Sequence, residues 1–402
     1  MNQHNNRFVS VSTVALVAST FLWCSSGIQY NHVAVHPKTH ADVARMVELV
    51  NKHGGELLGD KTAVVSGGGH VLRRFKRDLT NSNLRHTMVN FLYTVARQYP
   101  NMTRFFDVGV SNEGREIMGL EINKPTESSQ PKIGVWIDAG VHAREWISHA
   151  TALYAIWALL EGQQDPTIQK LHRHVHFYVV PNANPDGYEY SWQQGKRFWR
   201  KNRAGIFCGW STFMSRTDDC CGVDLNRNFP FKWGVSGASR NPCTDTYLGQ
   251  HPLSSPEAQA YAQVVEQLKA NITLFLTLHS YGQTVLVPYG YSTSAYPQDY
   301  SELMRVAQAG SVAMGRPYGE AYTAKHSAAL YPAGGGSDDW AKSIGIPYVY
   351  TVELRPNPAE ITLAGFHVPA SEIANSATEL LYGLEAMLDA IQQRRRRNNA
   401  LL

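Results

Sequence analysis

Residues 133–160 read IGVWIDAGVHAREWISHATALYAIWALL, and this stretch decides the fold. Its first part, Ile133–Asp138, is a short apolar run rich in β-branched residues, as expected of a buried strand. Its last part, Trp146–Leu160, is apolar and long enough for a buried helix. A polar turn lies between them. A strand that leads through a short polar loop into a helix is typical of sheets covered by helices.

The same alternation continues on both sides of this unit. Further strands are predicted at Phe106–Val110, Glu116–Ile122, Val175–Val180, Ile272–Leu278 and Ile346–Val352. Helices are predicted at Leu84–Tyr99, from Ser254-Ser255-Pro256 onward, and along apolar positions 373–391. We therefore predict the α/β fold class, with a single large domain built on a mixed, mainly parallel sheet flanked by helices.

Four chemically active residues follow three of the predicted strands. His142 and Glu145 come after Ile133–Asp138, His279 comes directly after the strand ending at Leu278, and Glu353 follows the strand ending at Val352. Ligands of such sheets bind beyond the carboxyl ends of the strands. Two histidines and two carboxylates are therefore predicted to converge on one edge of the sheet.

This combination predicts a metal site with hydrolytic chemistry. His142, Glu145 and His279 form a His₂Glu set, which in proteins holds a catalytic zinc with one open position. Glu353 would be the additional carboxylate, free to take a proton from water that the metal activates. Taken singly, the first two residues could be a capped helix start and His279 could be structural. Ser280 is a weak candidate nucleophile, because no G-x-S-x-G elbow surrounds it.

Several ordered motifs resemble those of the secreted zinc metallocarboxypeptidases, the carboxypeptidase A/B family. The first is HAREW at 142–146, which resembles the first zinc motif of that family. The others are NPDG at 184–187, RFWRK at 197–201, VDLNRN at 223–228, HSY at 279–281 and TVELR at 351–355. The match runs along nearly all of residues 80–390. The resemblance implies an eight-stranded sheet and one Zn²⁺ per catalytic domain.

The resemblance also implies roles for the catalytic residues. The implied zinc ligands are His142, Glu145 and His279. Glu353 resembles the general base, and Arg200 resembles the residue that stabilises the oxyanion as the scissile carbonyl becomes tetrahedral. Asp224 resembles a partner that orients His142.

Substrate-binding residues follow from the same motifs. The residues that match those holding the free C-terminal carboxylate are Asn226, Arg227 and Tyr331. The residues that match those lining the outer subsites are Arg144, Tyr281 and Phe366. An arginine can hold a carboxylate bidentately, and that contact restricts such enzymes to the last residue of a chain. The expected partners are thus peptide or protein C-termini.

Specificity depends on Asp338, in the segment GGSDDW at 335–340. Asp338 falls where B-type members carry aspartate and A-type members carry an apolar residue. A desolvated carboxylate would favour departing Lys or Arg, and Gly290 would leave room for a long side chain. We predict a B-type preference. The alternatives are an outward-facing Asp338, with A-type preference for apolar residues, and an inactive carboxypeptidase-like binding protein.

The two ends of the chain predict secretion and processing. Residues 1–27 resemble a signal peptide, with an apolar run at 8–23; a membrane anchor is the rival interpretation. Residues 28–77 are predicted to be a short α+β prosegment, with a strand at Tyr30–Val35 and a helix at Ala41–Val50. It ends in RRFKR at 73–77, either a site for an activating protease or a solvated loop. The catalytic domain is expected over 78–391 and a basic tail over 392–402.

Cysteine usage fits an extracellular protein. Cys24 lies in the predicted signal peptide, and the other four are Cys208, Cys220, Cys221 and Cys243. Four cysteines suggest two disulfides with three possible connectivities, and their spacing argues against a second zinc site. The resemblance implies Cys220–Cys243, which pairs Cys208 with Cys221. The tripeptides that begin at Asn101 and Asn271 are glycosylation sequons.

Net charge argues against a nucleic-acid partner, because the total is only +4. Residues 1–77 contribute +5 and the last nine residues contribute +4, so residues 78–393 carry −5. No later stretch is long and apolar enough for a membrane span. We expect a monomer. The Arg394–Arg397 tail is either a disordered, solvated segment or a surface that binds polyanions.

Overall fold

A computed structural model of the chain describes residues 87–126, 131–205, 220–357 and 362–399, and four short strands before residue 36. Those strands form two antiparallel pairs, β1 (Leu16–Val17) with β4 (Ala34–Val35) and β2 (Phe21–Trp23) with β3 (Gln29–Asn31). The predicted strand at Tyr30–Val35 is thus divided between β3 and β4. The predicted helix at 41–50, the basic cluster at 73–77 and Cys208 lie outside the described residues.

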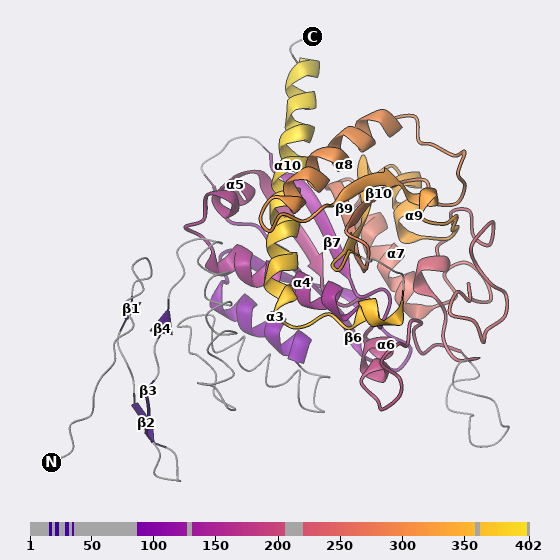
Figure 1. The fold of residues 1–402 in the computed structure, drawn as a ribbon, viewed down its shortest axis with the longest axis horizontal. Coiled ribbons are helices and arrows are strands. Elements are labelled where there is room, and N and C mark those ends of the chain that lie inside the picture. Colours follow the sequence, from indigo (N-terminus) through magenta and orange to yellow (C-terminus); the bar gives the residue numbers. More distant parts are fainter. Residues whose placement is uncertain are drawn as a thin grey trace.

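An eight-stranded sheet forms the centre of the molecule (Figure 1). Its strands are β5 (Thr103–Val110), β6 (Glu116–Ile122), β7 (Ile133–Ala139), β8 (Val175–Val180), β9 (Ile272–Ser280), β10 (Thr284–Val287), β11 (Thr323–His326) and β12 (Tyr348–Leu354). They are ordered β11-β10-β12-β9-β7-β8-β6-β5. The pairs β10–β11, β12–β9, β9–β7 and β7–β8 are parallel, and the other three are antiparallel. The predicted α/β class and mixed, mainly parallel sheet are confirmed.

Helices cover both faces of this sheet (Figure 1). They are α3 (Thr87–Gln98), α4 (Trp146–Glu161), α5 (Pro166–His174), α6 (Pro185–Ser191), α7 (Pro256–Leu268), α8 (Tyr300–Gly315), α9 (Ser337–Ser343) and α10 (Glu372–Asn399). Short 3₁₀ turns occur at η3 (Leu225–Arg227), η4 (Ser327–Ala329) and η5 (Leu363–Phe366). None of the helices in the described ranges is long and apolar enough to cross a membrane.

The side chains of β7 point alternately into two separate hydrophobic cores. Val135 and Ile137 point to the face covered by α3, α4, α5, α8 and α10, whereas Trp136 points to the face covered by α7 and α9. Successive side chains of a strand point to opposite faces, so a strand covered on both faces is apolar throughout. This explains why every residue of β7 is buried.

The last helix differs from its predicted end. Apolar spacing predicted a helix to Ile391 with a separate basic tail, but α10 continues to Asn399. Glutamine and arginine are good helix formers, and arginines in a last turn interact favourably with the helix dipole. Arg394 also approaches Glu302 on α8, at 3.8 Å. The interpretation of residues 394–397 as a disordered segment is therefore wrong.

Candidate active site

The connection from β7 to α4 brings two of the predicted site residues together. Gly140 has a φ of +73°, and a Cβ there would lie 2.0 Å from the ring of His149. The chain can therefore make this turn only with glycine. Glu145 occupies the N-cap position of α4, and its backbone N–H donates to the His142 carbonyl at 3.2 Å. The loop thus directs both side chains beyond the end of β7.

The neighbouring strands supply the other two residues. The sequence placed His279 and Glu353 just after strands, but β9 continues to Ser280 and β12 to Leu354. In this parallel pair His279 lies directly opposite Glu353. Residues paired in this way point to the same face of a sheet, so the register itself places imidazole and carboxyl side by side. His279 is buried and Glu353 is partly buried.

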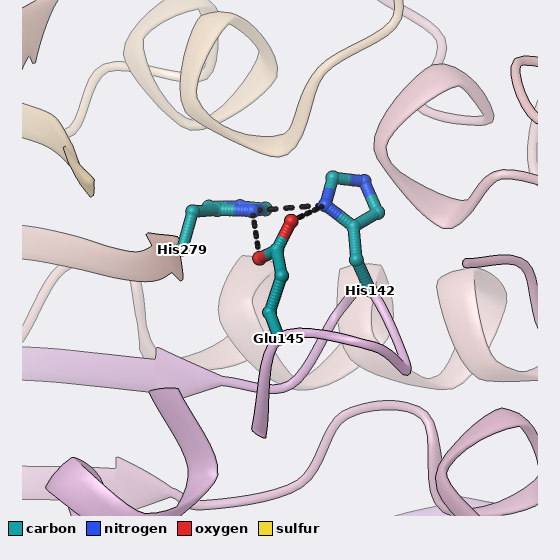
Figure 2. A group of neighbouring side chains, drawn as sticks. All are labelled: His142, Glu145 and His279. Atoms are coloured by element: carbon teal, nitrogen blue, oxygen red, sulfur yellow. Dashed lines mark hydrogen bonds and ion pairs between the residues drawn. The ribbon is translucent and has the colours of Figure 1, made fainter. Parts of the chain in front are cut away.

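His142, Glu145 and His279 form one compact group (Figure 2). Glu145 Oε1 lies 2.7 Å from His142 Nδ1, and its Oε2 lies 3.0 Å from His279 Nδ1. One ligand atom from each residue falls within 4.8 Å of the others, and all three side chains are buried. Two imidazoles and one carboxylate are the donors that Zn²⁺ takes in catalytic sites, so this group fits a zinc ion.

Asp224 connects this group to Arg200. Its Oδ1 lies 3.1 Å from His142 Nε2, and its Oδ2 accepts a hydrogen bond from Arg200 Nε at 3.0 Å. Burial would raise the pKa of Asp224, but Arg200 and His142 hold that pKa well below its usual range. An ionised Asp224 fixes the ring orientation of His142, as carboxylate partners of ligand histidines do.

Two groups of the site hold protons unusually tightly. Burial raises the pKa of Glu353 to about 7. Burial would lower the pKa of His279, but Glu145 beside it raises that pKa to about 9. Without a cation, His279 therefore carries a proton at neutral pH, and a metal ion must displace that proton in order to bind.

Asn226, Arg227 and Tyr331 line a cavity that also reaches Glu353. Arg227 Nε donates to the Gly237 carbonyl at 2.8 Å, and the guanidinium carbon lies 5.8 Å from the centre of the Tyr331 ring. Tyr331 remains 51% exposed. The arginine is therefore fixed while the tyrosine beside it stays at the surface.

A known family matches this combination of fold and side chains. The family described as zinc carboxypeptidase matches residues 88–383, about three quarters of the chain. The chain belongs to the zinc carboxypeptidase family. It is therefore a peptidase and a hydrolase of a family that depends on zinc.

Individual relatives agree over most of their length. Carboxypeptidase O of Bos taurus is 37% identical over 302 residues, which cover 75% of this chain and 76% of that protein. Carboxypeptidase B of Astacus astacus is 35% identical over 306 residues, covering 75% and 94%. The crystal structure of thrombin activatable fibrinolysis inhibitor has a TM-score of 0.69 at 28% identity, covering 90% of this chain and 88% of that one.

Asp338 lies inside the carboxypeptidase's cavity rather than facing solvent. It is buried in the first turn of α9, and its Oδ2 accepts a hydrogen bond from Thr351 Oγ1 at 3.0 Å. Asp339 behaves differently: it accepts the backbone N–H groups of Gly290 and Tyr291, at 2.7 and 3.1 Å. The outward orientation considered for Asp338 is therefore not observed.

Arg144, Tyr281 and Phe366 come together at the outer side of the carboxypeptidase site. The Arg144 guanidinium carbon lies 4.8 Å from the centre of the Phe366 ring, whose edge contacts Tyr281. Arg144 also donates to Asp245 at 2.8 Å, in a bond that the sequence did not indicate. Arg197 lies 3.7 Å above the Trp146 ring and donates to the Arg144 carbonyl. The sequence indicated Arg197 only as part of the RFWRK motif, but its fixed position holds the loop that carries Arg144.

A buried polar group behind His279 was also missed. Thr277 Oγ1 lies 3.3 Å from His279 Nε2 and donates to Asp138 Oδ1 at 2.8 Å. Asp138 also accepts from Trp136 and Tyr261. The signal in the sequence was an aspartate in an otherwise apolar strand, because a carboxylate buried there needs hydrogen-bond partners.

The cysteines agree with the implied pairing as far as they are described. Cys220 and Cys243 form a disulfide. Cys221 is buried and disulfide-bonded, while its expected partner Cys208 lies outside the described residues. The disulfide closes the segment that carries Asp224, Asn226 and Arg227, so it restrains the loop behind the site.

Proposed function

We propose that this carboxypeptidase is a zinc-dependent exopeptidase that releases C-terminal lysine and arginine from peptides and proteins. Asp338 carries the proposal, because its buried carboxylate lines the same cavity as Arg227 and Tyr331. Within the described ranges no cationic side chain forms an ion pair with Asp338. A buried carboxylate is costly without a partner, and the side chain of a basic substrate would supply one.

Three residues would hold the zinc ion, namely His142, Glu145 and His279. When bound, the ion would polarise the scissile carbonyl and the attacking water. Asp224 keeps His142 in the ring orientation that presents its free nitrogen to the ion. The donors come from one loop and one strand, so the sheet edge itself fixes their separation.

Glu353 would move the proton and Arg200 would stabilise the developing charge. Ionised Glu353 takes a proton from the attacking water and passes it to the leaving amine. Arg200 is held by Asp224, so its position does not change as negative charge develops on the carbonyl oxygen. Asn226, Arg227 and Tyr331 would hold the substrate's terminal carboxylate, which restricts cleavage to the last peptide bond.

Matched peptides that end in Arg or Phe test the specificity. We expect kcat/KM to be about 100-fold higher for the Arg peptide, because a site with a buried polar group strongly rejects a side chain that leaves that group unpaired. The variant Asp338→Ala should lose this advantage and keep its activity on the Phe peptide. Asp107→Ala, which changes an aspartate on β5, is the matched control. A wild-type preference for Phe would refute B-type specificity.

Two alternative functions can be tested with the same peptides. Relatives carry both A-type and B-type names, so an A-type preference for apolar residues is the first alternative. The second is an inactive binding protein, which the filled catalytic positions argue against. Zinc content and turnover of any C-terminal residue distinguish the two: bound zinc without turnover would support the inactive alternative.

We also propose that the protein is secreted as a monomeric precursor, with a signal peptide at 1–27 and a prosegment at 28–77. The Cys220–Cys243 disulfide supports an oxidising compartment. The basic cluster at 73–77 supports activation by a protease, which would release a catalytic domain over 78–391 with the basic segment 392–402. Expression in secreting cells, N-terminal sequencing before and after trypsin, and size-exclusion chromatography test these points. Retention of residues 1–27 in secreted protein would contradict the signal peptide.

A further inference from the structure

Basic side chains gather along the sheet edge that lies opposite the active site. This edge contains the starts of β5, β7, β8 and β9 and the end of β6, as the pairings require. Arg104 at this edge forms an ion pair with Glu121 at 2.6 Å. The side chains, called here the basic row, are Arg104, Lys124, Lys132, Arg173 and Arg395. Arg395 belongs to it because its guanidinium lies 3.4 Å from Thr273 Oγ1 on β9.

Two lysines at the centre of the basic row lie close together, and no acidic side chain of the described ranges pairs with either. Lys132 donates to Asn123 Oδ1 at 3.0 Å and to the Lys124 backbone carbonyl, while Lys124 donates to Gln163 at 2.9 Å. Neither forms an ion pair with any residue in the described ranges. Burial and the charge of Lys124 lower the pKa of Lys132. Two ammonium groups held together in this way would gain from a bound anion.

The end of α10 extends the basic row. Arg395, Arg396 and Arg397 are exposed, and consecutive residues of a helix point in different directions around its axis. This end projects beyond the body of the molecule (Figure 1). Lys170 on α5 binds Glu385 and Asp389 on α10, at 3.0 and 2.6 Å. The two helices are therefore held together, and the arginines continue the charge of Arg173.

We propose that the basic row and the end of α10 form a docking surface for a linear sulfated polysaccharide. Strands lie about 4.8 Å apart, so the five strands from β9 to β5 span about 19 Å, a track suited to a polymer with repeated anionic groups. The surface lies one strand length, about 20 Å, from the catalytic residues. The protein could therefore be held on a polyanion with its active site open, which goes beyond the proposed peptidase function.

The surroundings of the row favour this polymer over other anionic partners. Of the exposed large apolar side chains in the described residues, Tyr93 lies beside this edge, because its ring contacts that of Phe105 next to Arg104. A membrane surface is usually bound with several such apolar anchors, and single-stranded nucleic acid is bound by stacking on several aromatic rings. A sulfated sugar chain needs neither.

Binding of a heparin dodecasaccharide, measured by fluorescence polarisation in 0.15 M NaCl, tests the proposal. Because the sequons at Asn101 and Asn271 lie near this edge, protein freed of N-glycans is used. The variants Lys124→Gln/Lys132→Gln and Arg395→Gln/Arg396→Gln/Arg397→Gln should each weaken binding about tenfold and reduce its salt dependence. The pair Arg240→Gln/Arg316→Gln, which removes two charges elsewhere, is the matched control and should bind as wild type does. Hydrolysis of a short peptide should be unchanged in all of them.

Several outcomes would overturn the proposal. One is a wild-type protein that does not bind heparin at this salt concentration. Another is an equal loss in the control pair, which would mean that net charge alone decides binding. Equally tight binding to phosphatidylserine vesicles or to poly(U) RNA would reject a polysaccharide-selective surface. Peptide hydrolysis is measured separately, so failure here leaves the proposed peptidase function standing.

Discussion

Glu353 shows how one partly buried carboxyl can serve catalysis at neutral pH. Its pKa is raised to about 7, so at neutral pH the carboxylate can accept a proton from water and then donate it to the leaving amine. Only the ionised form can accept a proton, so kcat/KM should fall as pH drops through this pKa. A bound cation would lower the pKa, which places the acidic limb below pH 7. A pH profile of kcat/KM on an Arg-ending peptide measures this limb.

The variant Glu353→Gln removes the base without changing the size of the side chain. We expect about a 10²–10⁴-fold loss of kcat/KM, the usual contribution of a positioned acid–base group. Zinc content, measured by atomic absorption, should equal that of the wild type, because Glu353 is not among the three clustered donors. Full activity in this variant would exclude Glu353 as the base.

Adjacent aspartates illustrate what sequence could not decide at the scale of residues. Asp338 and Asp339 have the same chemistry, and the resemblance alone suggested which one faces the pocket. The first turn of α9 turns Asp338 toward Thr351 and Asp339 toward the backbone of Gly290. Such directions depend on the helix start, which residue types alone do not specify.

At the scale of elements, the turn from β7 into α4 depends on Gly140. The variant Gly140→Ala combines a positive φ with a Cβ contact of 2.0 Å to the His149 ring. We expect a loss of about 2–4 kcal/mol in the free energy of unfolding, measured by urea denaturation. The control is Gly114→Ala, which has a φ of +79° but no atom within 4 Å of the added Cβ. It should lose only about 1 kcal/mol, and equal losses would show that the contact is unimportant.

Arg355 ties the end of β12 to α10. Its Nε and Nη2 bind both oxygens of Glu379, at 2.9 and 2.6 Å, and Glu379 is fully buried. Breaking a buried pair leaves an uncompensated charge, so Arg355→Met should lower the free energy of unfolding by about 3–5 kcal/mol. Arg355→Met/Glu379→Met should recover part of that loss in urea denaturation, because Glu372 and Tyr322 still lose their bonds to the pair. If the double variant loses as much free energy of unfolding as Arg355→Met and Glu379→Met lose together, the two residues do not stabilise each other and the prediction fails.

Long elements were predictable and short ones were not. The bounds of Glu116–Ile122 and Val175–Val180 match β6 and β8. Runs of four residues such as β10 and β11 carry too few positions for a period to be recognised. The predicted ends at Leu278 and Val352 were wrong because polar His279 and Glu353 continue buried strands. His279 is buried there with Glu145 and Thr277 as polar partners, which single-sequence patterns do not reveal.

Charged groups gather at both edges of the sheet. The catalytic edge holds Glu145, Glu353 and Asp338 together with Arg200 and Arg227, and the opposite edge holds the basic row. Residues 78–393 carry a net charge of −5 and the tail is positive, but only the fold shows which charges share a surface. Parallel strands account for this, since all their carboxyl ends meet at one edge.

The stability of the whole protein should depend on pH, and so should the additional stability that metal binding provides. In the metal-free protein the pKa of His279 is raised to about 9 and that of Glu353 to about 7. Protonation of these groups therefore stabilises the folded state at low pH, and this stabilisation is lost as pH rises through the two pKa values. Zinc competes with the proton on His279, so its affinity should rise over the same range.

Thermal melts with zinc and with a chelator measure this coupling. The zinc-induced rise in Tm should be larger at pH 9 than at pH 6, by about 5 °C or more, because one displaced proton changes zinc affinity up to tenfold per pH unit. In His279→Gln the rise should be small at both pH values, since one of the three donors is gone. A rise that is constant with pH, or largest at pH 6, would mean that His279 does not hold the proton that zinc displaces.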